Sequence, residues 1–539
     1  MDITLILKNK IQSAFNKLGQ EVALNDIVIE NSKDKAHGDY ASNAAMKFSR
    51  LFAKSPRDVA NLIIDNIDME GIEKIEIAGP GFINFFMKSD SLQAIVKKII
   101  DEEDNYGRTE RRNSKVNVEF VSANPTGLLH VGTARGAAIG DSICRILDFA
   151  GYDVTREYYI NDAGSQITNL GLSLEARYKE LFGIEASIPE DGYAGHDIIE
   201  IAEHLKEEIG DKALYMENAL DFFKEKAMKV ELDRIIKDLD LFRVHFDVFS
   251  SEKVIRGDNA IEKEIAFLKD YVYEAEGALY LKTTAFIDDK DRVIKKSNGD
   301  YTYFMPDICY HVNKMSRGYD FIIDVLGADH HGYINRMKSA LMMHGYKQDA
   351  LHVELIQMVR FLKDGQEFKA SKRRGDAITL RDVCEEVGVD AMRYFFAMRA
   401  ASGHLDFDMD LAKEQSSNNP VYYAQYAHAR LCSILEQGKD IPLDISAQLL
   451  KEDSEISLLK HLADFNNVIN DAAKEKAPYK ITNYIHTLAE LVHVFYNECR
   501  VIDKVNHDLC ASRLALVKAS KIVLKNALNL IGVSAPTHM

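Results

Sequence analysis

Apolar residues near the N-terminus alternate between helical and strand spacing. Positions 2–18 and 89–103 show the three- and four-residue spacing of amphipathic helices. Between them, positions 27–30, 75–78 and 82–86 are short apolar runs bounded by turn residues, which is typical of strands. A charged, turn-like stretch follows the second helix, and we interpret it as a linker. The pattern predicts an N-terminal α+β domain over residues 1–110.

The next segment predicts a parallel α/β sheet. Residues 115–122 and 154–159 have strand character, and residues 133–150 between them form a helical pattern that ends before Gly151. This strand–loop–helix–strand order is how a parallel sheet begins. Residues from about 170 to 290 are charged and helically periodic, so we expect a helical insertion there.

Strand patterns return after the insertion, and helices then continue to the end of the chain. We expect strands near 301–304, 321–325 and 352–355, and helices from about 390 onward. The predicted fold class is α/β. It combines a Rossmann-like parallel-sheet domain over residues 111–400 with an all-α helix bundle over residues 401–539.

Composition narrows the class of protein. Hydrophobic residues make up 46% and charged residues 28%, as in ordinary globular proteins. Neither a membrane-spanning run nor a signal peptide is recognisable, so we expect a cytoplasmic protein without a membrane partner. The net charge of −17 argues against nonspecific nucleic-acid binding, although it permits a local basic face. The six cysteines are scattered, which predicts neither a disulfide framework nor a zinc site.

The first candidate for chemistry is the segment 124–133, Asn-Pro-Thr-Gly-Leu-Leu-His-Val-Gly-Thr, which joins a predicted strand to a predicted helix. A helix N-terminus offers free N–H groups and the positive end of the helix dipole, and both suit a phosphate. His130 adds a donor just before that end. Gly132, Gly136 and Gly140 would let a backbone or a ligand approach closely. The alternative is a tightly packed crossover with a structural histidine.

Two later segments add charge. Residues 368–375, Phe-Lys-Ala-Ser-Lys-Arg-Arg-Gly, place four cations in one loop, where lysines can neutralise a transferring phosphate; the alternative is a solvated loop. Residues 327–332, Gly-Ala-Asp-His-His-Gly, follow a strand, and Asp329 is well placed for a ribose hydroxyl. His330 and His331 lack a third ligand at a suitable spacing, so we predict no protein-bound metal.

Together, His-Val-Gly-Thr at 130–133 and Lys-Ala-Ser-Lys-Arg at 369–373 resemble the HIGH and KMSKS signatures of class I aminoacyl-tRNA synthetases. Thr133 stands where the second histidine would be, which argues against a catalytic donor at that site. Ala370 and Arg373 replace the methionine and the last serine.

Longer stretches resemble the bacterial arginyl-tRNA synthetase family, in order along the whole chain. They are 37–41, 79–84, 118–127, 158–164, 419–430 and 532–536. The resemblance implies ATP-dependent activation of L-arginine to arginyl-adenylate, followed by transfer to the 2′-hydroxyl of the terminal adenosine of tRNA(Arg). Magnesium would arrive with ATP. A monomer is the expected state.

The resemblance also implies residue roles. The catalytic residues would be His130, Lys369 and Lys372. The ATP-binding residues would be Gly127, His130, Gly132, Thr133, Asp329, Lys369, Ser371 and Lys372. The arginine-binding residues would be Glu119, Asn124, Tyr303 and Asp307. A planar guanidinium pairs bidentately with carboxylates, so two acids in this set fit arginine. The alternatives are a structural partnership with an arginine for Glu119 and core packing for Tyr303.

The tRNA would be bound by both ends of the chain. Lys518, Lys521 and Lys525 share one helical face in a segment without acids, which predicts a phosphate-binding stripe. Tyr423 and Tyr426 are candidates to stack on anticodon bases, the alternative being core tyrosines. The N-terminal domain is expected to touch the tRNA elbow, with Asn84 a candidate contact.

Two rival functions remain. A small nucleotidylyltransferase can carry a HIGH-like motif, but that class lacks an anticodon bundle, and residues 400–539 argue against it. A noncatalytic tRNA-binding paralogue would be expected to lose the positions of His130 and Lys372, and both are present. Arginine-dependent charging of purified tRNA separates the three.

Overall fold

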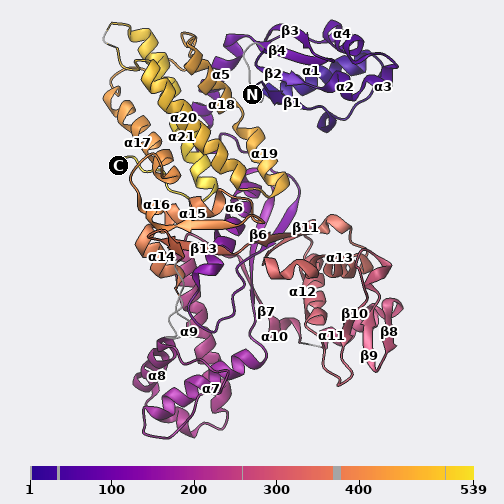
Figure 1. Ribbon diagram of the computed structural model, residues 1–539, viewed down its shortest axis with the longest axis vertical. Helices are drawn as coiled ribbons and strands as arrows, with labels where there is room; N and C mark the ends of the chain where they lie inside the picture. Colours follow the sequence, from indigo (N-terminus) through magenta and orange to yellow (C-terminus); the bar gives the residue numbers. More distant parts are fainter. Residues whose placement is uncertain (1–2, 33–36, 258, 368–377, 504) are drawn as a thin grey trace.

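The computed structural model describes residues 3–32, 37–257, 259–367, 378–503 and 505–539, and the molecule is elongated (Figure 1). The N-terminal unit and the C-terminal helices lie at one end, the parallel sheet lies in the middle, and two insertions extend from the other end. Among the described residues, none of the helices has the length and apolar character needed to cross a membrane.

The N-terminal unit is a four-stranded antiparallel sheet of order β1-β2-β4-β3 covered by helices. Its strands are β1 (Ile29–Asn31), β2 (Tyr40–Ser42), β3 (Ile72–Ala78) and β4 (Phe82–Met87). Its helices are α1 (Ile3–Lys17), α2 (Ala44–Lys47), α3 (Ser49–Phe52) and α4 (Pro56–Asn66). The Ser55 side chain caps α4, and Pro56 occupies the first turn, where its missing N–H costs nothing. The first helix and the strands expected here are confirmed.

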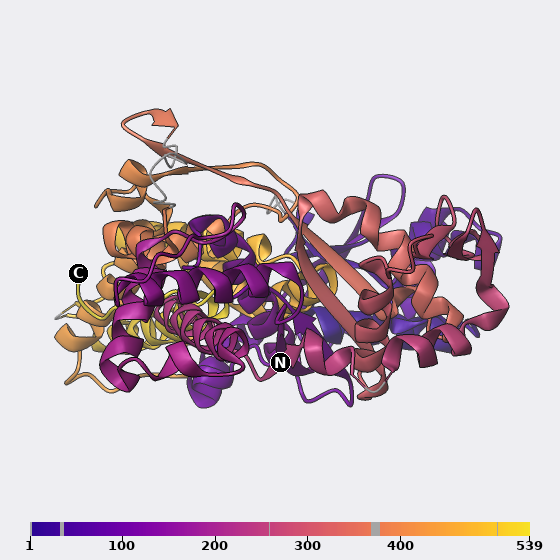
Figure 2. The same cartoon turned by 90° about the horizontal axis from the view of Figure 1, so that it is seen from below.

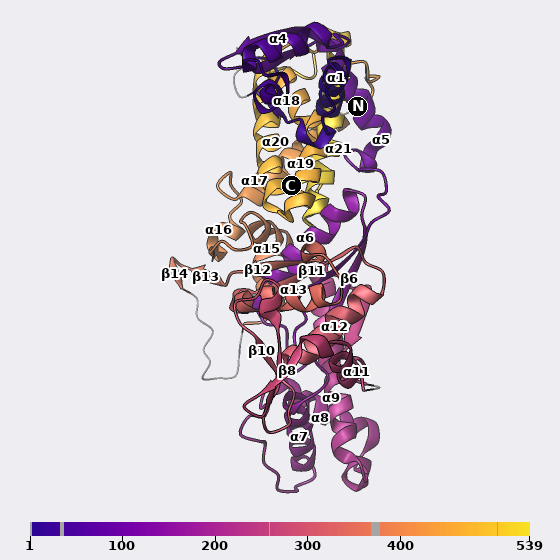
Figure 3. The same ribbon diagram turned by 90° about the vertical axis from the view of Figure 1, so that its right-hand side faces the viewer.

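The segment after β4 packs against the C-terminal helices. α5 (Ser89–Glu102) contacts α18 (Asp453–Ala463) and α21 (His507–Leu530), and Figure 3 shows α5 running beside α21. The connection that follows is also held in place. The Tyr106 hydroxyl donates to the Leu462 carbonyl at 2.8 Å, and the Asn526 amide donates to the Glu103 carbonyl at 2.9 Å. The expected linker is therefore a packed connection.

Five parallel strands form the central sheet in the order β12-β11-β5-β6-β7. They are β5 (Lys115–Glu119), β6 (Asp153–Ile160), β7 (Val248–Ser251), β11 (Phe321–Gly327) and β12 (Leu351–Ile356). The buried helix α6 (Ala134–Phe149) connects β5 to β6. A Cβ on Gly140 would collide with the Phe120 ring, so this glycine lets α6 pack against the end of β5.

Two insertions interrupt this sheet, and Figure 2 shows them side by side as separate bodies. The first, between β6 and β7, contains α7 (Ser165–Glu180), α8 (His196–Ile209) and α9 (Ala219–Leu241) around its own core. The second, between β7 and β11, contains α10 (Glu252–Ile255), α11 (Ala260–Phe267), β8 (Val272–Ala275), β9 (Ala278–Leu281), β10 (Arg292–Lys295) and α12 (Phe304–Ser316).

The expectation of one helical insertion over 170–290 was therefore wrong in two respects. β7 lies inside that range and belongs to the central sheet, and β8, β9 and β10 form an antiparallel sheet. Glu276 and Gly277 both have positive φ angles, which suits the two-residue turn joining β8 to β9.

The strand expected at 301–304 was also wrong. Tyr301 makes only an isolated bridge with Lys295, and Phe304 begins α12. Pro306 lies in the first turn of that helix, where a residue without an N–H is tolerated.

A small sheet of order β14-β13-β15 lies beyond the central sheet. β13 (Val359–Lys363) and β14 (Gln366–Glu367) form a hairpin that projects from the body in Figure 3. β15 (Leu405–Asp408) pairs with β13, so the expectation of helices alone after residue 390 needs this correction. The nearby helices are α13 (Ile334–Met343), α14 (Leu380–Val387), α15 (Val389–Ala397) and α16 (Met409–Lys413).

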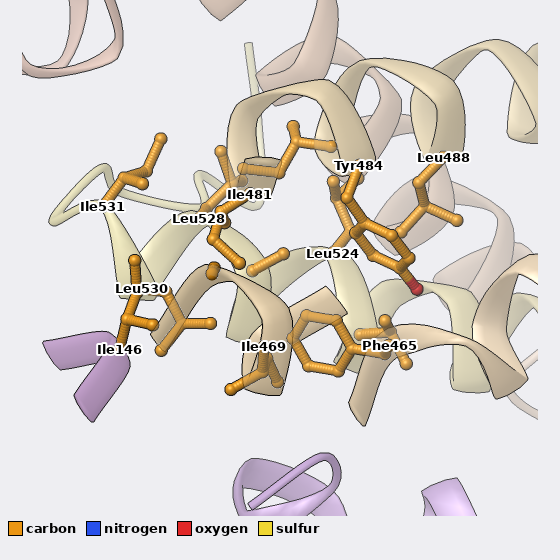
Figure 4. Close-up of a cluster of buried hydrophobic side chains, with 14 of the residues drawn as sticks. Ile146, Phe465, Ile469, Ile481, Tyr484, Leu488, Leu524, Leu528, Leu530 and Ile531 are labelled. Carbon is orange, nitrogen blue, oxygen red and sulfur yellow. The ribbon is translucent and has the colours of Figure 1, made fainter. Parts of the chain in front are cut away.

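The C-terminal bundle packs around α21, which is buried along most of its length. Its other helices are α17 (Pro420–Gln437), α18, α19 (Phe465–Glu475) and α20 (Tyr479–Glu498). Figure 4 shows Phe465, Tyr484 and Leu524 meeting in its core. The bundle is tied to the sheet by the fully buried Arg393, which donates to the Ile531 carbonyl at 2.9 Å and to Asp141 of α6 at 2.5 Å.

Candidate active site and tRNA-binding surface

The loop after β5 adopts an unusual backbone. Val121 and Ser122 have φ angles of 67° and 40°, in a region that non-glycine residues seldom occupy. The Ser122 hydroxyl donates to Glu119 Oε1 at 2.9 Å and accepts from the Tyr159 N–H at 3.1 Å. The strained loop therefore holds one oxygen of the Glu119 carboxylate and ties β5 to β6 at the carboxyl edge of the sheet.

His130 lies at the start of a 3₁₀ turn, Val131–Thr133, that leads into α6. Its Nδ1 accepts the Gly132 N–H at 2.9 Å, so a proton on the neutral ring is on Nε2. Partial burial lowers the pKa of His130, which favours the neutral ring. The Thr133 hydroxyl donates to the His130 carbonyl at 2.6 Å. His130 is thus oriented as a donor through Nε2 at the exposed N-terminal end of α6.

The same loop is braced by the segment that precedes α14. The Val131 N–H donates to the Ile378 carbonyl at 3.1 Å, and the Leu380 N–H donates to the Leu129 carbonyl at 2.8 Å. The predicted residues Lys369, Ser371 and Lys372 lie outside the described residues. Ile378, the first described residue after them, lies next to the His130 loop.

The four predicted arginine-binding residues are partly assembled. Glu119 is buried at the end of β5. Burial of Asp307 in α12 raises the pKa of its carboxyl to about 6, and the charge of Glu119 adds to this rise. The Asn124 amide donates to the Gln166 side chain at 2.6 Å. Tyr303, just before α12, is 87% exposed, so it is not a core residue. Within the described residues, the Asp307 carboxylate has no hydrogen bond or ion pair.

The sequence did not point to three further groups here. Glu252, at the start of α10, is buried beside the Tyr159 hydroxyl and also raises the pKa of Asp307. Lys314 of α12 is fully buried and donates to Glu119 Oε2. The alternative of an ion pair for Glu119 is thus realised with a lysine, and the third group is Ser122, described above.

A second buried pair lies deeper on the same helix. His311 Nε2 lies 2.7 Å from Asp324 Oδ2, and its Nδ1 lies 2.7 Å from the Asp307 carbonyl. Both neighbours are acceptors, so both ring nitrogens donate. Burial alone would lower the pKa of His311, but the charge and hydrogen bond of Asp324 outweigh burial and raise it. Lys314 and His311 keep the pKa of the buried Asp324 below its ordinary value.

Asp329 follows β11, in the 3₁₀ turn Ala328–Tyr333, and its side chain is exposed. It therefore stands at the carboxyl edge of the sheet, as the sequence suggested. Gly127 and Gly132 lie in the His130 loop, and the φ angle of Gly127, 157°, favours glycine. No group of three or more potential metal-binding side chains is found among the described residues.

The predicted tRNA contacts differ in exposure. Tyr423 and Tyr426 of α17 lie against His493 of α20, with ring centroids 4.7 and 6.0 Å away, and Tyr426 is 39% exposed. Lys518, Lys521 and Lys525 are half-buried positions on the otherwise buried α21, and Lys525 pairs with Asp104 at 2.8 Å. Asn84 is only 3% exposed within β4.

Comparisons with known proteins agree along the chain. Residues 5–87 match the family model for the arginyl tRNA synthetase N terminal domain, residues 95–400 match the tRNA synthetases class I (R) catalytic domain, and residues 424–539 match the DALR anticodon binding domain.

Full-length relatives and solved structures agree as well. The arginine–tRNA ligase of Bacillus subtilis is 50% identical over 99% of this chain and 98% of its own length, as is that of Anoxybacillus flavithermus. The arginyl-tRNA synthetase structure of Thermus thermophilus shares the fold, with a TM-score of 0.80 and 22% identity over 99% of each chain. The chain therefore belongs to the arginyl-tRNA synthetase family.

Proposed function

We propose that this protein ligates L-arginine to tRNA(Arg). The arginine carboxylate attacks the α-phosphate of ATP and expels pyrophosphate, and the 2′-hydroxyl of the terminal adenosine then attacks the adenylate and expels AMP. The environment of the Asp307 carboxylate is the observation that carries the proposal. Burial raises the pKa of this carboxyl to about 6; the charges of Glu119 and Glu252 add to this rise, and those of His311 and Arg336 oppose it. Among the described residues, neither cation forms an ion pair or hydrogen bond with the Asp307 carboxylate. A guanidinium would supply the missing charge and donors.

On the arginine side, Glu119 and Asp307 receive the guanidinium, while Asn124 and Tyr303 complete the pocket. Because Tyr303 is exposed and Asn124 is bonded to Gln166, both side chains must turn toward the bound amino acid. The pocket is thus completed by the substrate, and arginine binding should order these two residues.

On the ATP side, His130 Nε2 and the N-terminal end of α6 meet the phosphates, with Gly127, Gly132 and Thr133 giving close backbone approach. Asp329 takes the ribose. Lys369, Ser371 and Lys372 stabilise the leaving pyrophosphate, where preorganised positive charge lowers the barrier. Magnesium enters as part of the ATP substrate, since it is usually bound through substrate phosphates and water.

The tRNA side divides between the two ends of the chain. Residues 401–539 read the anticodon, with Tyr423 and Tyr426 stacking on bases and Lys518 and Lys521 meeting phosphates; Lys525 joins them once it leaves Asp104. Residues 1–110 contact the tRNA elbow, and Asn84 takes part only if β4 shifts, because it is buried. Residues 111–400 carry the chemistry. We place the enzyme in the cytoplasm as a monomer.

Charging of purified tRNA(Arg) with labelled arginine tests this function. We expect ATP-dependent formation of arginyl-tRNA that stops when ATP or arginine is left out. A protein that binds tRNA(Arg) but leaves it uncharged would support the noncatalytic paralogue, and pyrophosphate release without any tRNA product would contradict the second step.

A further inference from the structure

Three acidic residues form a row across the central sheet. Asp324 of β11 lies opposite Glu119 of β5, and Glu119 lies opposite Glu157 of β6. Register partners in neighbouring parallel strands point to the same face of a sheet, so the three carboxylates are neighbours. All three are buried. Like charges placed side by side and out of water repel each other strongly, so this row requires cations.

The cations come from one helix that lies over the row. His311 and Lys314 of α12 both bind Asp324, and Arg317 just after the helix binds Glu157 Oε2 at 2.6 Å. Lys314 lies between Asp324 and Glu119 and also sits 4.4 Å from the centre of the Tyr310 ring. With His311 protonated, three cations balance three carboxylates.

Asp307 stands outside this balance. It lies on α12 seven residues before Lys314, and the charges of His311, Glu119 and Arg336 reach it without forming a direct ion pair among the described residues. The site therefore contains one carboxylate that is bound directly by a resident cation, Glu119, and one that has no ion pair or hydrogen bond in the described part of the chain, Asp307. An ion-pair row of this kind is weak evidence for stability, since apolar side chains often serve a buried site equally well. The position of the row beside the proposed pocket therefore fits a role in orientation better than a role in stability.

We propose that Lys314 is a positioning residue for the arginine substrate. Lys314 binds one oxygen of the Glu119 carboxylate and Ser122 binds the other, so the orientation of the carboxylate is fixed. This proposal rests on the arginine pocket proposed above. Because both of its oxygens are bound, Glu119 presents its remaining lone pairs in one direction. Lys314 already balances the charge of Glu119, so the positive charge of the substrate pairs with Asp307. A planar fork can engage both carboxylates at once, whereas a point-like ammonium cannot.

The first test is the arginine KM of Lys314→Met in tRNA(Arg) charging. Methionine keeps the length of the side chain and removes the ammonium. We expect the arginine KM to rise about 30-fold or more, because Glu119 loses its fixed orientation, while the KM values for ATP and tRNA stay within about threefold. The matched control is Arg317→Met, which removes a cation from the same row but from Glu157; its arginine KM should stay within about threefold.

A double variant keeps the test decisive if Lys314→Met folds poorly. In Glu119→Gln/Lys314→Met both members of the pair are gone, and no carboxylate at position 119 is left unpaired. Because Lys314 acts through Glu119, the double variant should have the same arginine KM as Glu119→Gln, within about threefold. A further increase of about tenfold, or a folded Lys314→Met with a normal arginine KM, would overturn the proposal. A normal arginine KM in Glu119→Gln would instead overturn the arginine pocket itself.

Discussion

The proposed arginine pocket and the proposed anticodon-binding surface of α17 and α20 differ in the interactions that form them. At the pocket and the sheet row beside it, Glu119, Asp324 and Glu157 are buried and each has a cationic partner, whereas Asp307 has no ion pair among the described residues. On α17 and α20, aromatic rings lie against each other: Tyr426 is nearly parallel to Tyr422 and to His493, with angles of 15° and 18°. Buried, paired carboxylates suit the binding of one small charged group, whereas exposed parallel rings suit the stacking of flat bases.

This difference predicts different sizes of mutational effect. A buried carboxylate that loses or gains a partner changes binding by several kcal/mol, because water cannot replace the partner. A stacking contact contributes about 1–3 kcal/mol per base and is shared among several rings. Single substitutions in the pocket should therefore reduce arginine binding strongly, whereas single substitutions on the helical surface should each reduce tRNA binding by a small, roughly additive amount.

The largest effect is expected for Asp307→Asn. The change keeps the shape of the side chain and removes the charge that the guanidinium needs, so arginine kcat/KM should fall about 10²- to 10³-fold. Steady-state charging with arginine varied at saturating ATP and tRNA measures it, and the ATP KM serves as the internal control. Without arginine, the variant should melt a few degrees higher, since burial of the ionised Asp307 is then no longer a cost. An unchanged arginine KM would place the charged pocket elsewhere.

The next effect concerns Lys372→Ala, in the cationic segment outside the described residues. A charge that meets pyrophosphate mainly in the transition state should contribute to kcat, so we expect kcat to fall about 10²-fold while arginine affinity barely changes. Pyrophosphate exchange with tRNA(Arg) present measures this step. Near-normal exchange would remove Lys372 from the catalytic residues.

A smaller effect is expected on the helical surface. Tyr426→Ala removes one exposed ring from the stack with Tyr422 and His493, so the KM for tRNA(Arg) should rise about tenfold. The arginine KM should not move. Tyr426→Phe keeps the ring and is the matched control. If the alanine variant binds tRNA normally, α17 does not face the anticodon, and the helical surface is not the base-stacking region that the comparison assumes.

The smallest effect is a pH dependence confined to the pocket. The pKa of Asp307 in the arginine-free protein is about 6, raised from its ordinary value, so the group gains a proton as the pH falls through 6. Only the ionised form pairs with a guanidinium, so the arginine KM at pH 5.5 should be about fourfold higher than at pH 7.5. The ratio of the two KM values in Asp307→Asn should be close to one, and a tyrosine variant of α17 should keep the wild-type ratio.

The two regions also differ in what their sequence reveals. Glu119 and Asp307 were reached through resemblance and through the match between carboxylates and a guanidinium. The sequence does not single out Lys314, because the strand pattern it predicts at residues 301–304 obscures the helical spacing of Asp307, His311 and Lys314. The row of Asp324, Glu119 and Glu157 depends on strand order, and no local pattern encodes which strands are neighbours.

On the helical surface, spacing carried more of the information. The i, i+3 and i+7 spacing of Lys518, Lys521 and Lys525 coincides with half-buried positions along the otherwise buried α21. The ion-pair partners of these lysines cannot be predicted from local spacing, since Lys525 pairs with Asp104, more than four hundred residues earlier in the chain. The same limit applies to Asn84, whose burial follows from packing around β4.

The choice between arginine and lysine is the most direct test of the central claim. Lysine carries the same charge, so only the geometry of Glu119 and Asp307 separates the two amino acids. A site built to hydrogen-bond one group rejects an analogue lacking it by about 10⁴-fold, and that is the ratio of kcat/KM we predict for charging tRNA(Arg) with arginine rather than lysine. A ratio near one, or a ratio that Asp307→Asn leaves unchanged, would contradict recognition of the guanidinium by these carboxylates.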